Sequence, residues 1–244
     1  MANNLNKLSQ EEHPNNVREI ATLRFGRHQY DVELVQPWSH DRKEVEQFTH
    51  DIYALRYKAD ISQFLPHMVA MRHSESKQLV ASAGFQTTHS DTDKKTLFLE
   101  QYLDFPIEKA ASAVGRRRFQ RSDFVEVGNL AGAITGAGHL ITLTLAEYLT
   151  KRGYDWIAFT LTRNMVRAFE SLKLQPISLV GASEERVSDD RTTWGSYFNT
   201  RPEVMIGDMQ SAYQKMKRMG LYNSISYQAY NSSENQLSKQ GLPS

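Results

Sequence analysis

The spacing of hydrophobic and polar positions predicts strands and then a helix in the first part of the chain. Residues 20–34 alternate apolar and polar side chains around Gly26, which predicts a strand or a hairpin. Apolar residues then recur at spacings of three and four, as on one face of a helix: Val45, Phe48, Ile52 and Leu55. Proline disfavours helical geometry at the preceding residue, so the helix should end before Pro66.

The pattern is most informative in residues 124–174. An apolar strand with a single carboxylate, residues 124–130, is followed by a glycine-bearing turn and a long amphipathic segment. A second strand, around residues 156–162, and a shorter helical segment complete the unit. This alternation of strands and helices predicts an α/β domain.

Further strands are expected on either side of this unit, at residues 68–72, 79–87, 177–180 and 204–206. The last helix carries one apolar stripe, which consists of Ile206, Met209, Tyr213, Met216 and Met219. A methionine stripe at this spacing usually packs into a core. A basic amphipathic helix can instead lie on a membrane or a partner, so both interpretations stay open.

Composition excludes several classes of function. The net charge of +1 gives no overall attraction to nucleic acid or to an anionic membrane. The chain has no cysteine, which excludes a disulfide framework and a thiolate metal site, and its eight histidines are scattered, so no metal is expected. No apolar run approaches the roughly 20 residues that span a bilayer, and the N-terminal segment has no apolar core typical of a secretory signal. We therefore expect a cytoplasmic protein with no nucleic-acid partner and no integral membrane contact.

The length of 244 residues suits one domain with extensions. Residues 1–17 are polar and are expected to form a disordered tail. Residues 18–208 are expected to form the domain, and residues 209–244 a C-terminal helix and a disordered tail. The disorder should begin at about Tyr222, where asparagine, serine and glutamine become frequent.

Glu126 is the first candidate for chemistry. A carboxylate in an apolar strand is costly unless it is paired or lines a wet cleft. The alternative to a functional role is a buried ion pair, for example with Arg56. Gly128 follows on the same face of the strand and marks either a close approach or a bulge. A bulge would free a backbone N–H to bind a carbonyl oxygen or an oxyanion.

The glycines of the turn AITGAGHL are the second candidate. Gly136 and Gly138 precede a helix, where backbone amides can converge on a phosphate. An ordinary strand–helix turn explains them equally well, and no GK[ST] follows to make a Walker loop. His139 beside them is either a ligand contact or a capping or surface histidine.

A basic cluster contains Arg116, Arg117, Arg118 and Arg121. Such a run is usually a solvated connection between elements. It can also form a docking patch for an acidic or phosphate-bearing partner.

The central residues resemble the GNAT acyltransferase superfamily, whose pantetheine-binding strand is followed by a loop of pattern [QR]xxGx[GA] and a helix. Residues 133–138 keep both small positions but begin with Ala133. Asn164, Phe169 and Leu174 fall in step with the second motif of the superfamily, with Phe169 at the frequent tyrosine acid. The resemblance therefore does not imply acetyl transfer with a tyrosine proton donor.

The chain also resembles two more closely defined groups of proteins. The residues EVGNL at 126–130 are similar to the ExSRF strand of acyl-homoserine-lactone synthases, which also have an arginine-bearing N-terminal segment comparable to that of Arg56. The chain also resembles the proteins named thermostable hemolysins over residues 18–210. Their motifs occur here as EVGNLA (126–131), WIAFTLT (156–162), FESLKL (169–174), WGSYF (194–198) and PEV (202–204).

The resemblance implies a GNAT-like three-layer α/β fold with a central mixed β-sheet flanked by helices. It implies transfer of an acyl group, expected to be fatty, from an acyl carrier protein or coenzyme A thioester to a small amine. Glu126 and Asn129 are the expected catalytic residues. Residues expected to bind the thioester cofactor are Gly128, Leu130, Ala131, Gly136, Ala137, Gly138, Asn164 and Phe169. Those expected to bind the acceptor are Arg56, Tyr57, Glu100, Thr160 and Thr162, and Arg116, Arg117 and Arg118 would dock the carrier.

Two alternatives come from other classes of function. A cytolysin would disrupt membranes directly, for example through the C-terminal helix, but the sequence has neither an amphipathic hairpin array nor a long apolar segment. A non-catalytic acyl-binding protein would hold a thioester without turnover.

Overall fold

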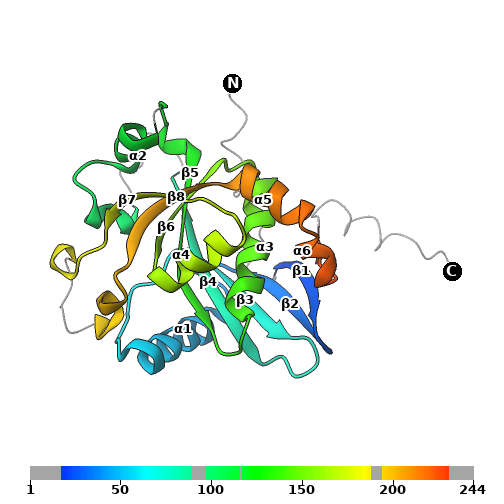
Figure 1. Ribbon diagram of the computed structural model, residues 1–244. Helices are drawn as coiled ribbons and strands as arrows, with labels where there is room; N and C mark the ends of the chain where they lie inside the picture. Colours follow the sequence, from blue (N-terminus) through cyan, green and yellow to red (C-terminus); the bar gives the residue numbers. More distant parts are fainter. Residues whose placement is uncertain (1–17, 89–96, 116, 188–193, 231–244) are drawn as a thin grey trace.

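A single large sheet organises the described part of the chain, residues 18–88, 97–115, 117–187 and 194–230 of a computed structural model (Figure 1). The strands that the structure describes lie in the order β7-β8-β6-β5-β4-β3-β2-β1-β9. Their bounds are β1 Arg18–Phe25, β2 His28–Val35, β3 His67–His73, β4 Leu79–Thr87, β5 Phe124–Gly132, β6 Trp156–Leu161, β7 Ile177–Gly181, β8 Glu203–Asp208 and β9 Gln228–Ala229. The helices are α1 Arg42–Tyr57, α2 Ile107–Gly115, α3 Ala137–Lys151, α4 Arg163–Ser171, α5 Met209–Arg218 and α6 Leu221–Ser224. Short 3₁₀ turns lie at η1 Phe98–Tyr102, η2 Arg121–Asp123, η3 Glu184–Arg186 and η5 Tyr197–Thr200.

The sheet is mixed, as the sequence predicted. β5 and β6 pair in parallel, and the other described pairs are antiparallel. Parallel neighbours need a long crossover connection, which α3 provides between β5 and β6. This arrangement confirms the expected α/β fold with a mixed sheet flanked by helices.

The two faces of the sheet carry different helices. Alternate residues such as Val125 and Phe159 face the cores that contain α3, α4 and α5, which are grouped together in Figure 1. The intervening residues, such as Phe124 and Trp156, face a core with α2 and the aromatic end of α1. Because strand side chains alternate between faces, Glu126 lies on the second face.

Two of the three methionines in the stripe of the last helix belong to the core. Met209 and Met216 are 2% and 3% exposed, and α5 packs against α3. The core interpretation is therefore confirmed for Met209 and Met216, whereas Met219, which follows the last residue of α5, is 47% exposed. Among the described helices, none is long and apolar enough to cross a membrane.

The chain stays ordered beyond the expected start of the C-terminal tail. Tyr222 lies in α6, and its hydroxyl donates a hydrogen bond to the carbonyl of Leu143 (3.1 Å). Ala229 in β9 pairs with Ala21 in β1. The expectation of disorder from Tyr222 is thus wrong up to Tyr230, because aromatic packing on α3 outweighs the polar composition. Residues 231–244 and the expected tail 1–17 lie outside the described residues.

Candidate active site

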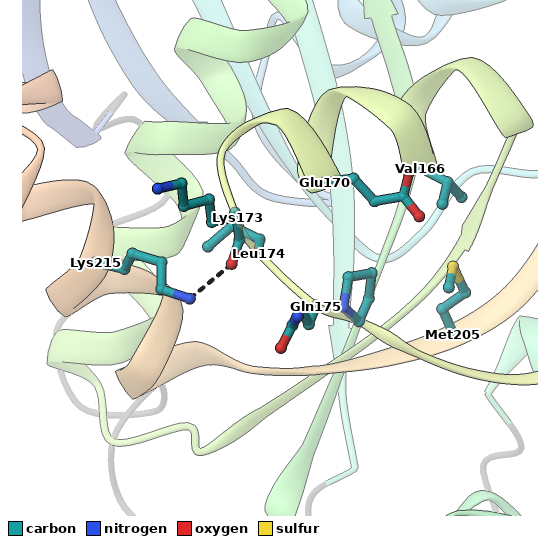
Figure 2. Close-up of a pocket in the computed structure, with 8 residues that line it drawn as sticks. Val166, Glu170, Lys173, Leu174, Gln175, Met205 and Lys215 are labelled. Carbon is teal, nitrogen blue, oxygen red and sulfur yellow. Dashed lines mark hydrogen bonds between the residues drawn. The ribbon is translucent and has the colours of Figure 1, made fainter.

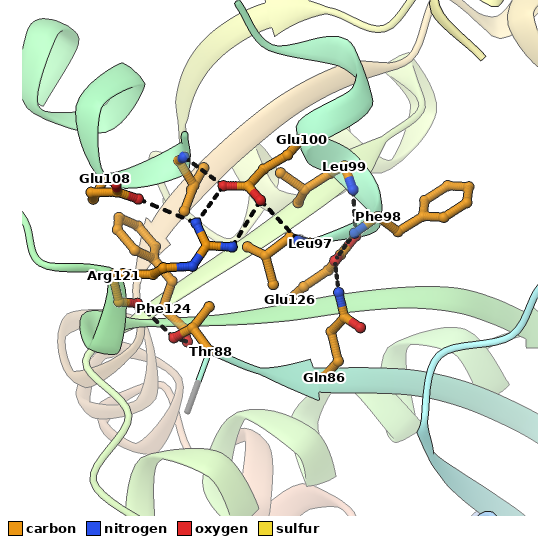
Figure 3. Close-up of polar contacts among 11 residues, drawn as sticks. Gln86, Thr88, Leu97, Phe98, Leu99, Glu100, Glu108, Arg121, Phe124 and Glu126 are labelled. Atoms are coloured by element: carbon orange, nitrogen blue, oxygen red, sulfur yellow. Dashed lines mark hydrogen bonds and ion pairs between the residues drawn. The ribbon is translucent and has the colours of Figure 1, made fainter. Parts of the chain in front are cut away.

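Glu126 is held in β5 by three hydrogen-bond donors (Figure 3). Its Oε2 accepts from the backbone N–H of Phe98 (2.7 Å) and from the side-chain amide of Gln86 (2.9 Å). Its Oε1 accepts from the backbone N–H of Leu99 (2.9 Å). The residue is only 3% exposed, so these donors replace water around the carboxylate.

Burial raises the pKa of Glu126 to about 7. The donors from Leu99, Phe98 and Gln86 act in the opposite direction but only partly offset this effect. No salt bridge of Glu126 occurs in the part of the chain that the structure describes, and Arg56 instead donates to the carbonyl of Gly132 (2.5 Å). The ion pair with Arg56 considered for Glu126 is therefore not formed. A carboxyl group that titrates near neutrality suits a general base.

Glu100 fixes the turn that supplies two of these donors. It accepts hydrogen bonds from the backbone N–H groups of Leu97 and Ile107, both at 2.8 Å. It also forms a two-pronged contact with the Arg121 guanidinium at 2.6 and 2.8 Å (Figure 3). Burial would raise the pKa of Glu100, but Arg121 and the backbone donors outweigh it and lower that pKa. The two carboxylate oxygens are thus engaged with the protein, although an acceptor contact was predicted here.

Replacing Glu100 with glutamine should destabilise the protein by about 3 kcal/mol, because it leaves the charge of the largely buried Arg121 without its main partner. Urea denaturation would measure this loss. The control is Glu108→Gln, which removes only the longer 3.3 Å contact to Arg121 and should cost less than 1 kcal/mol. Equal losses in the two variants would contradict a structural role for Glu100.

A bulge interrupts β5 just after the expected position. Gly128 pairs with Gly84, but the next described pair joins Ala131 to Ser82, so β5 has an additional residue. Asn129 lies in this bulge with a φ of +48°, in the left-handed region that asparagine tolerates better than most residues. The predicted bulge is therefore present and consists of Asn129 and Leu130.

Asn129, a predicted catalytic residue, connects the bulge to the segment after α1. Its Oδ1 accepts from the backbone N–H of Leu65 (2.8 Å), and its Nδ2 donates to the carbonyl of Gln63 (3.2 Å). Gly84 leaves room for this side chain, since a β-carbon there would lie 3.0 Å from Oδ1. The contacts of Asn129 suit a residue that holds the shape of the strand.

β5 and β6 separate just before the bulge. They pair only from Phe124 with Trp156 to Val127 with Phe159. β6 continues beside β8, where Thr160 pairs with Val204, while β5 continues beside β4. From Gly128 onward, the β6 side of β5 therefore has no strand partner in the described sheet. This open edge begins at Gly128 and passes Leu130, two residues predicted to bind the thioester, whereas Ala131 is only 1% exposed and pairs with Ser82 of β4.

Glycine and alanine residues lie where the open edge meets the start of α3. Gly136 has a φ of +86°, and α3 begins at Ala137. A β-carbon on Gly132 would lie 3.2 Å from the backbone nitrogen of Gly138, so the first turn of α3 packs directly on the end of β5. A β-carbon on Gly138 itself would meet nothing within 4 Å, which leaves space at the start of the helix.

The structure places the remaining predicted residues of β6 and α4 on both faces. Thr160 lies on the Glu126 face of β6, just beyond the separation from β5, and Thr162 is buried before α4. Asn164 is exposed in the first turn of α4. Phe169 packs on Phe159 (ring centroids 5.6 Å apart) on the opposite face. Phe169 thus belongs to the core around α4 and has no proton to donate.

An aromatic wall, defined here as Tyr53, Tyr57, Trp194 and Tyr197, covers the Glu126 face beside η1. Tyr57 lies 5.3 Å from Tyr197, and Trp194 lies 5.4 Å from Tyr197, between ring centroids. Trp194 also lies 6.2 Å from Phe98, whose N–H binds Glu126. Of this wall, only Tyr57 was predicted as a site residue.

Several site residues were missed from the sequence, namely Gln86, Phe98, Leu99, Tyr53, Trp194 and Tyr197. A signal existed for the last two, because both lie in the WGSYF motif. No pattern in the sequence could identify Gln86 or the backbone donors of Phe98 and Leu99. In the described parts of the chain, no group of three or more acidic or histidine side chains could hold a metal ion.

The arginine cluster separates into different environments. Arg116 lies outside the described residues. The Arg117 guanidinium lies over the ring of Phe119 (4.5 Å) and near that of Trp156 (5.1 Å), while Arg118 is exposed. Arg121 is engaged by Glu100. The predicted docking role of Arg117 and Arg118 stays a prediction.

A pocket of about 560 Å³ is lined by residues of α4, β8 and α5 and of the segment after α4 (Figure 2). Met205 lines it, and Met205 faces away from the side of β8 that carries Val204 and Ile206. The Lys215 amine donates to the carbonyl of Lys173 (2.6 Å) at its rim. The pocket is thus separated by the sheet from the buried carboxyl group.

Comparison with known proteins defines the family. The family model described as "Thermostable hemolysin" matches residues 35–213. The chain belongs to the thermostable hemolysin family. The matched region of this family member includes β5 with its bulge, the start of α3 and the aromatic wall. No curated protein sequence matches this chain.

Solved structures share the fold of this family member. FeeM, an N-acyl amino acid synthase from uncultured soil microbes, is 11% identical with a TM-score of 0.51, over 79% of this chain and 98% of FeeM. TofI in an apo form is 13% identical with a TM-score of 0.50, over 75% and 95% of the two chains. BjaI, a CoA-dependent acyl-homoserine lactone synthase with MTA, is 12% identical with a TM-score of 0.49, over 82% and 90%. The likeness to FeeM and TofI confirms the expected GNAT-like fold.

Proposed function

We propose that the protein is an N-acyltransferase that moves an acyl group from a coenzyme A or acyl carrier protein thioester to a small amine. The observation that supports this most is the buried Glu126, whose pKa of about 7 lies near the pH at which a base must act. It lies three residues before the bulge, close to the point where β5 separates from β6. The fold shared with FeeM, an N-acyl amino acid synthase, agrees with this chemistry.

The open edge of β5 suits an extended thioester donor. Backbone N–H groups between Gly128 and Leu130 would hold the thioester carbonyl, since a bulge leaves such groups without a strand partner. Gly136, Ala137 and Gly138 would receive the far end of the pantetheine arm at the start of α3. The space at Gly138 fits this arrangement, because a side chain there would occupy it.

Glu126 would remove a proton from the acceptor amine, directly or through one water. The amine nitrogen then attacks the thioester carbon, so that a C–N bond forms and the C–S bond breaks. The proton passes to Glu126, which returns it to the departing sulfur, directly or through one water, so that the sulfur leaves as a thiol and Glu126 is ionised again. We infer a fatty acyl group, because aromatic side chains line the face around Glu126.

Incubation of the purified protein with acyl-coenzyme A or acyl carrier protein and a panel of amines, including amino acids, tests this function. Mass spectrometry should detect an N-acyl amine together with release of the free thiol. A protein that binds the donor but yields no amide from any amine would be a non-catalytic acyl-binding protein, and the proposal would fail.

Gly138→Ala should separate stability from donor binding. Alanine is favoured over glycine in a helix, so the free energy of unfolding should increase by about 0.5 kcal/mol. The methyl group would enter the space assigned to the donor and should raise the donor KM severalfold. Thermal melts and steady-state kinetics measure the two effects, with Gly181→Ala as a control far from the open edge. An unchanged donor KM would contradict the assignment.

A further inference from the structure

Arg56 connects α1 to the far end of β5. It lies in the last turn of α1, and its Nη2 donates a hydrogen bond to the carbonyl of Gly132 (2.5 Å). Within the described residues this is the one hydrogen bond of the guanidinium, and Arg56 is exposed. A guanidinium carries five N–H donors in a planar fork, so most of them are available to a ligand.

Strand geometry shows which side of β5 this guanidinium occupies. The N–H of Ala133 donates to the carbonyl of Val80 in β4 (2.9 Å), so Ala133 faces β4. In a strand, the backbone groups of successive residues point to opposite sides. The Gly132 carbonyl therefore points away from β4, toward the side from which β6 has separated. Arg56 thus lies at the open edge.

Distance excludes Arg56 from the immediate surroundings of Glu126. Gly132 follows Glu126 by six residues, of which the bulge takes up one. At about 3.3 Å per residue, the two positions lie roughly 17–20 Å apart. A small amine that reacts at Glu126 does not extend so far, whereas the distal end of an extended pantetheine arm does.

The surroundings of Arg56 suit a phosphate. Gly132, which holds the guanidinium, packs against the first turn of α3 at Gly138. Arginine binds phosphate through paired N–H donors and is over-represented in such sites. The neighbouring groups at the end of α1 are the rings of Tyr53 and Tyr57, whose phenol pKa values Arg56 tends to lower against the effect of burial. A cation therefore faces the open edge where the donor's phosphate would arrive.

We propose that Arg56 binds the phosphate at the distal end of the pantetheine arm, the group that coenzyme A and a phosphopantetheinylated carrier share. This inference rests on the proposed function. It replaces the earlier expectation that Arg56 binds the acceptor, because the geometry places it at the other end of the donor.

The test compares Arg56→Met with wild type on three donors that carry the same acyl group: acyl-coenzyme A, acyl-4′-phosphopantetheine and acyl-pantetheine. The variant should raise the KM of both phosphate-bearing donors roughly tenfold, as expected for loss of a hydrogen bond to a charged group. The KM of acyl-pantetheine should change much less. Lys43→Met removes one exposed positive charge from the other end of α1 and should behave as wild type. Arg56→Lys keeps a charge and should give intermediate KM values.

An equal rise in KM for all three donors would overturn the proposal in favour of a role in shaping β5. A changed KM for the amine alone would return Arg56 to the acceptor, and an effect confined to acyl-coenzyme A would assign it to the nucleotide end. Calorimetric binding of 4′-phosphopantetheine and pantetheine needs no turnover. If the wild-type protein yields no amide, the proposed function fails. The assignment of Arg56 to the phosphate is still supported if the wild-type protein prefers the phosphate-bearing ligand and if Arg56→Lys keeps this preference while Arg56→Met loses it.

Discussion

Replacing Glu126 with glutamine is expected to lower kcat for acyl transfer at least about 100-fold, the usual contribution of a positioned general base. Glutamine keeps the size of the side chain, but its single oxygen can accept from only one of the Phe98 and Leu99 N–H groups, which bind different oxygens of Glu126. A thermal melt of the variant should therefore accompany the kinetics, to show that the turn stays in place. Single-turnover kinetics with a saturating donor would separate this loss from slow product release. Glu108→Gln, a carboxylate that contacts Arg121 rather than the open edge, should keep the wild-type rate.

The pH dependence of the reaction gives an independent check. Because burial raises the pKa of Glu126 to about 7, the wild-type kcat should rise with pH through about 7 as the base loses its proton. The residual rate of Glu126→Gln should lack this step. A variant with the wild-type rate, or with the same pH step, would show that Glu126 is not the base.

The same pKa shift affects stability with a defined sign. The folded-state pKa lies above the ordinary value of 4.5, so the folded protein holds its proton where the unfolded chain has lost it. The contribution of Glu126 to stability is then complete below pH 4.5 and declines as the pH rises to about 7. Relative to Glu126→Gln, the wild-type protein should lose on the order of 3 kcal/mol across this interval. Urea denaturation of both proteins between pH 5 and 8 measures the difference.

Gly195→Ala is expected to have the largest effect on stability, at least about 3 kcal/mol. Gly195 has a φ of +53°, where a β-carbon is strained, and that β-carbon would overlap the carbonyl oxygens of Tyr57 and Lys58. The overlap is with backbone, so no side chain can move aside to relieve it. The neighbouring Ser196 N–H donates to the same Tyr57 carbonyl (2.7 Å), which fixes the loop against α1.

Gly181→Ala is the matched control for this substitution. A β-carbon at Gly181 meets nothing within 4 Å, so its replacement should change the unfolding free energy by less than 1 kcal/mol. Near-ultraviolet circular dichroism would report whether Trp194 and Tyr197 leave their packed positions in Gly195→Ala. A Gly195→Ala protein as stable as Gly181→Ala would show that the loop has another way to approach α1.

The sequence was sufficient to predict the fold and to single out the strand of the candidate site. Glu126 stands out because one carboxylate interrupts an apolar run, and the glycines before α3 mark a turn that a helix follows. The bulge was predicted from Gly128 and lies at the next residue, where Asn129 adopts a left-handed conformation. These features depend on neighbouring residues, which local patterns describe well.

The environment of Glu126 depends on contacts that no local pattern contains. Gln86 and the N–H of Leu99 reach Glu126 from 40 and 27 residues away in the chain. Ser196 contacts Tyr57 across 139 residues, so the aromatic wall exists only once the chain has folded. The prediction that Arg56 binds the acceptor has the same limitation. The distance between Arg56 and Glu126 follows from the path of β5 and not from the position of Arg56 in the sequence.

The last turn of α1 has a consequence for how such a chain can change in evolution. This turn carries Arg56 at the edge of β5, two rings of the aromatic wall and the carbonyl that receives the loop of Gly195. One residue inserted earlier in α1 would rotate the turn by about 100° and displace all of these contacts together. Point substitutions can alter them one at a time, whereas insertions and deletions cannot. The length of α1 should therefore vary less among functional descendants than the identity of its exposed residues.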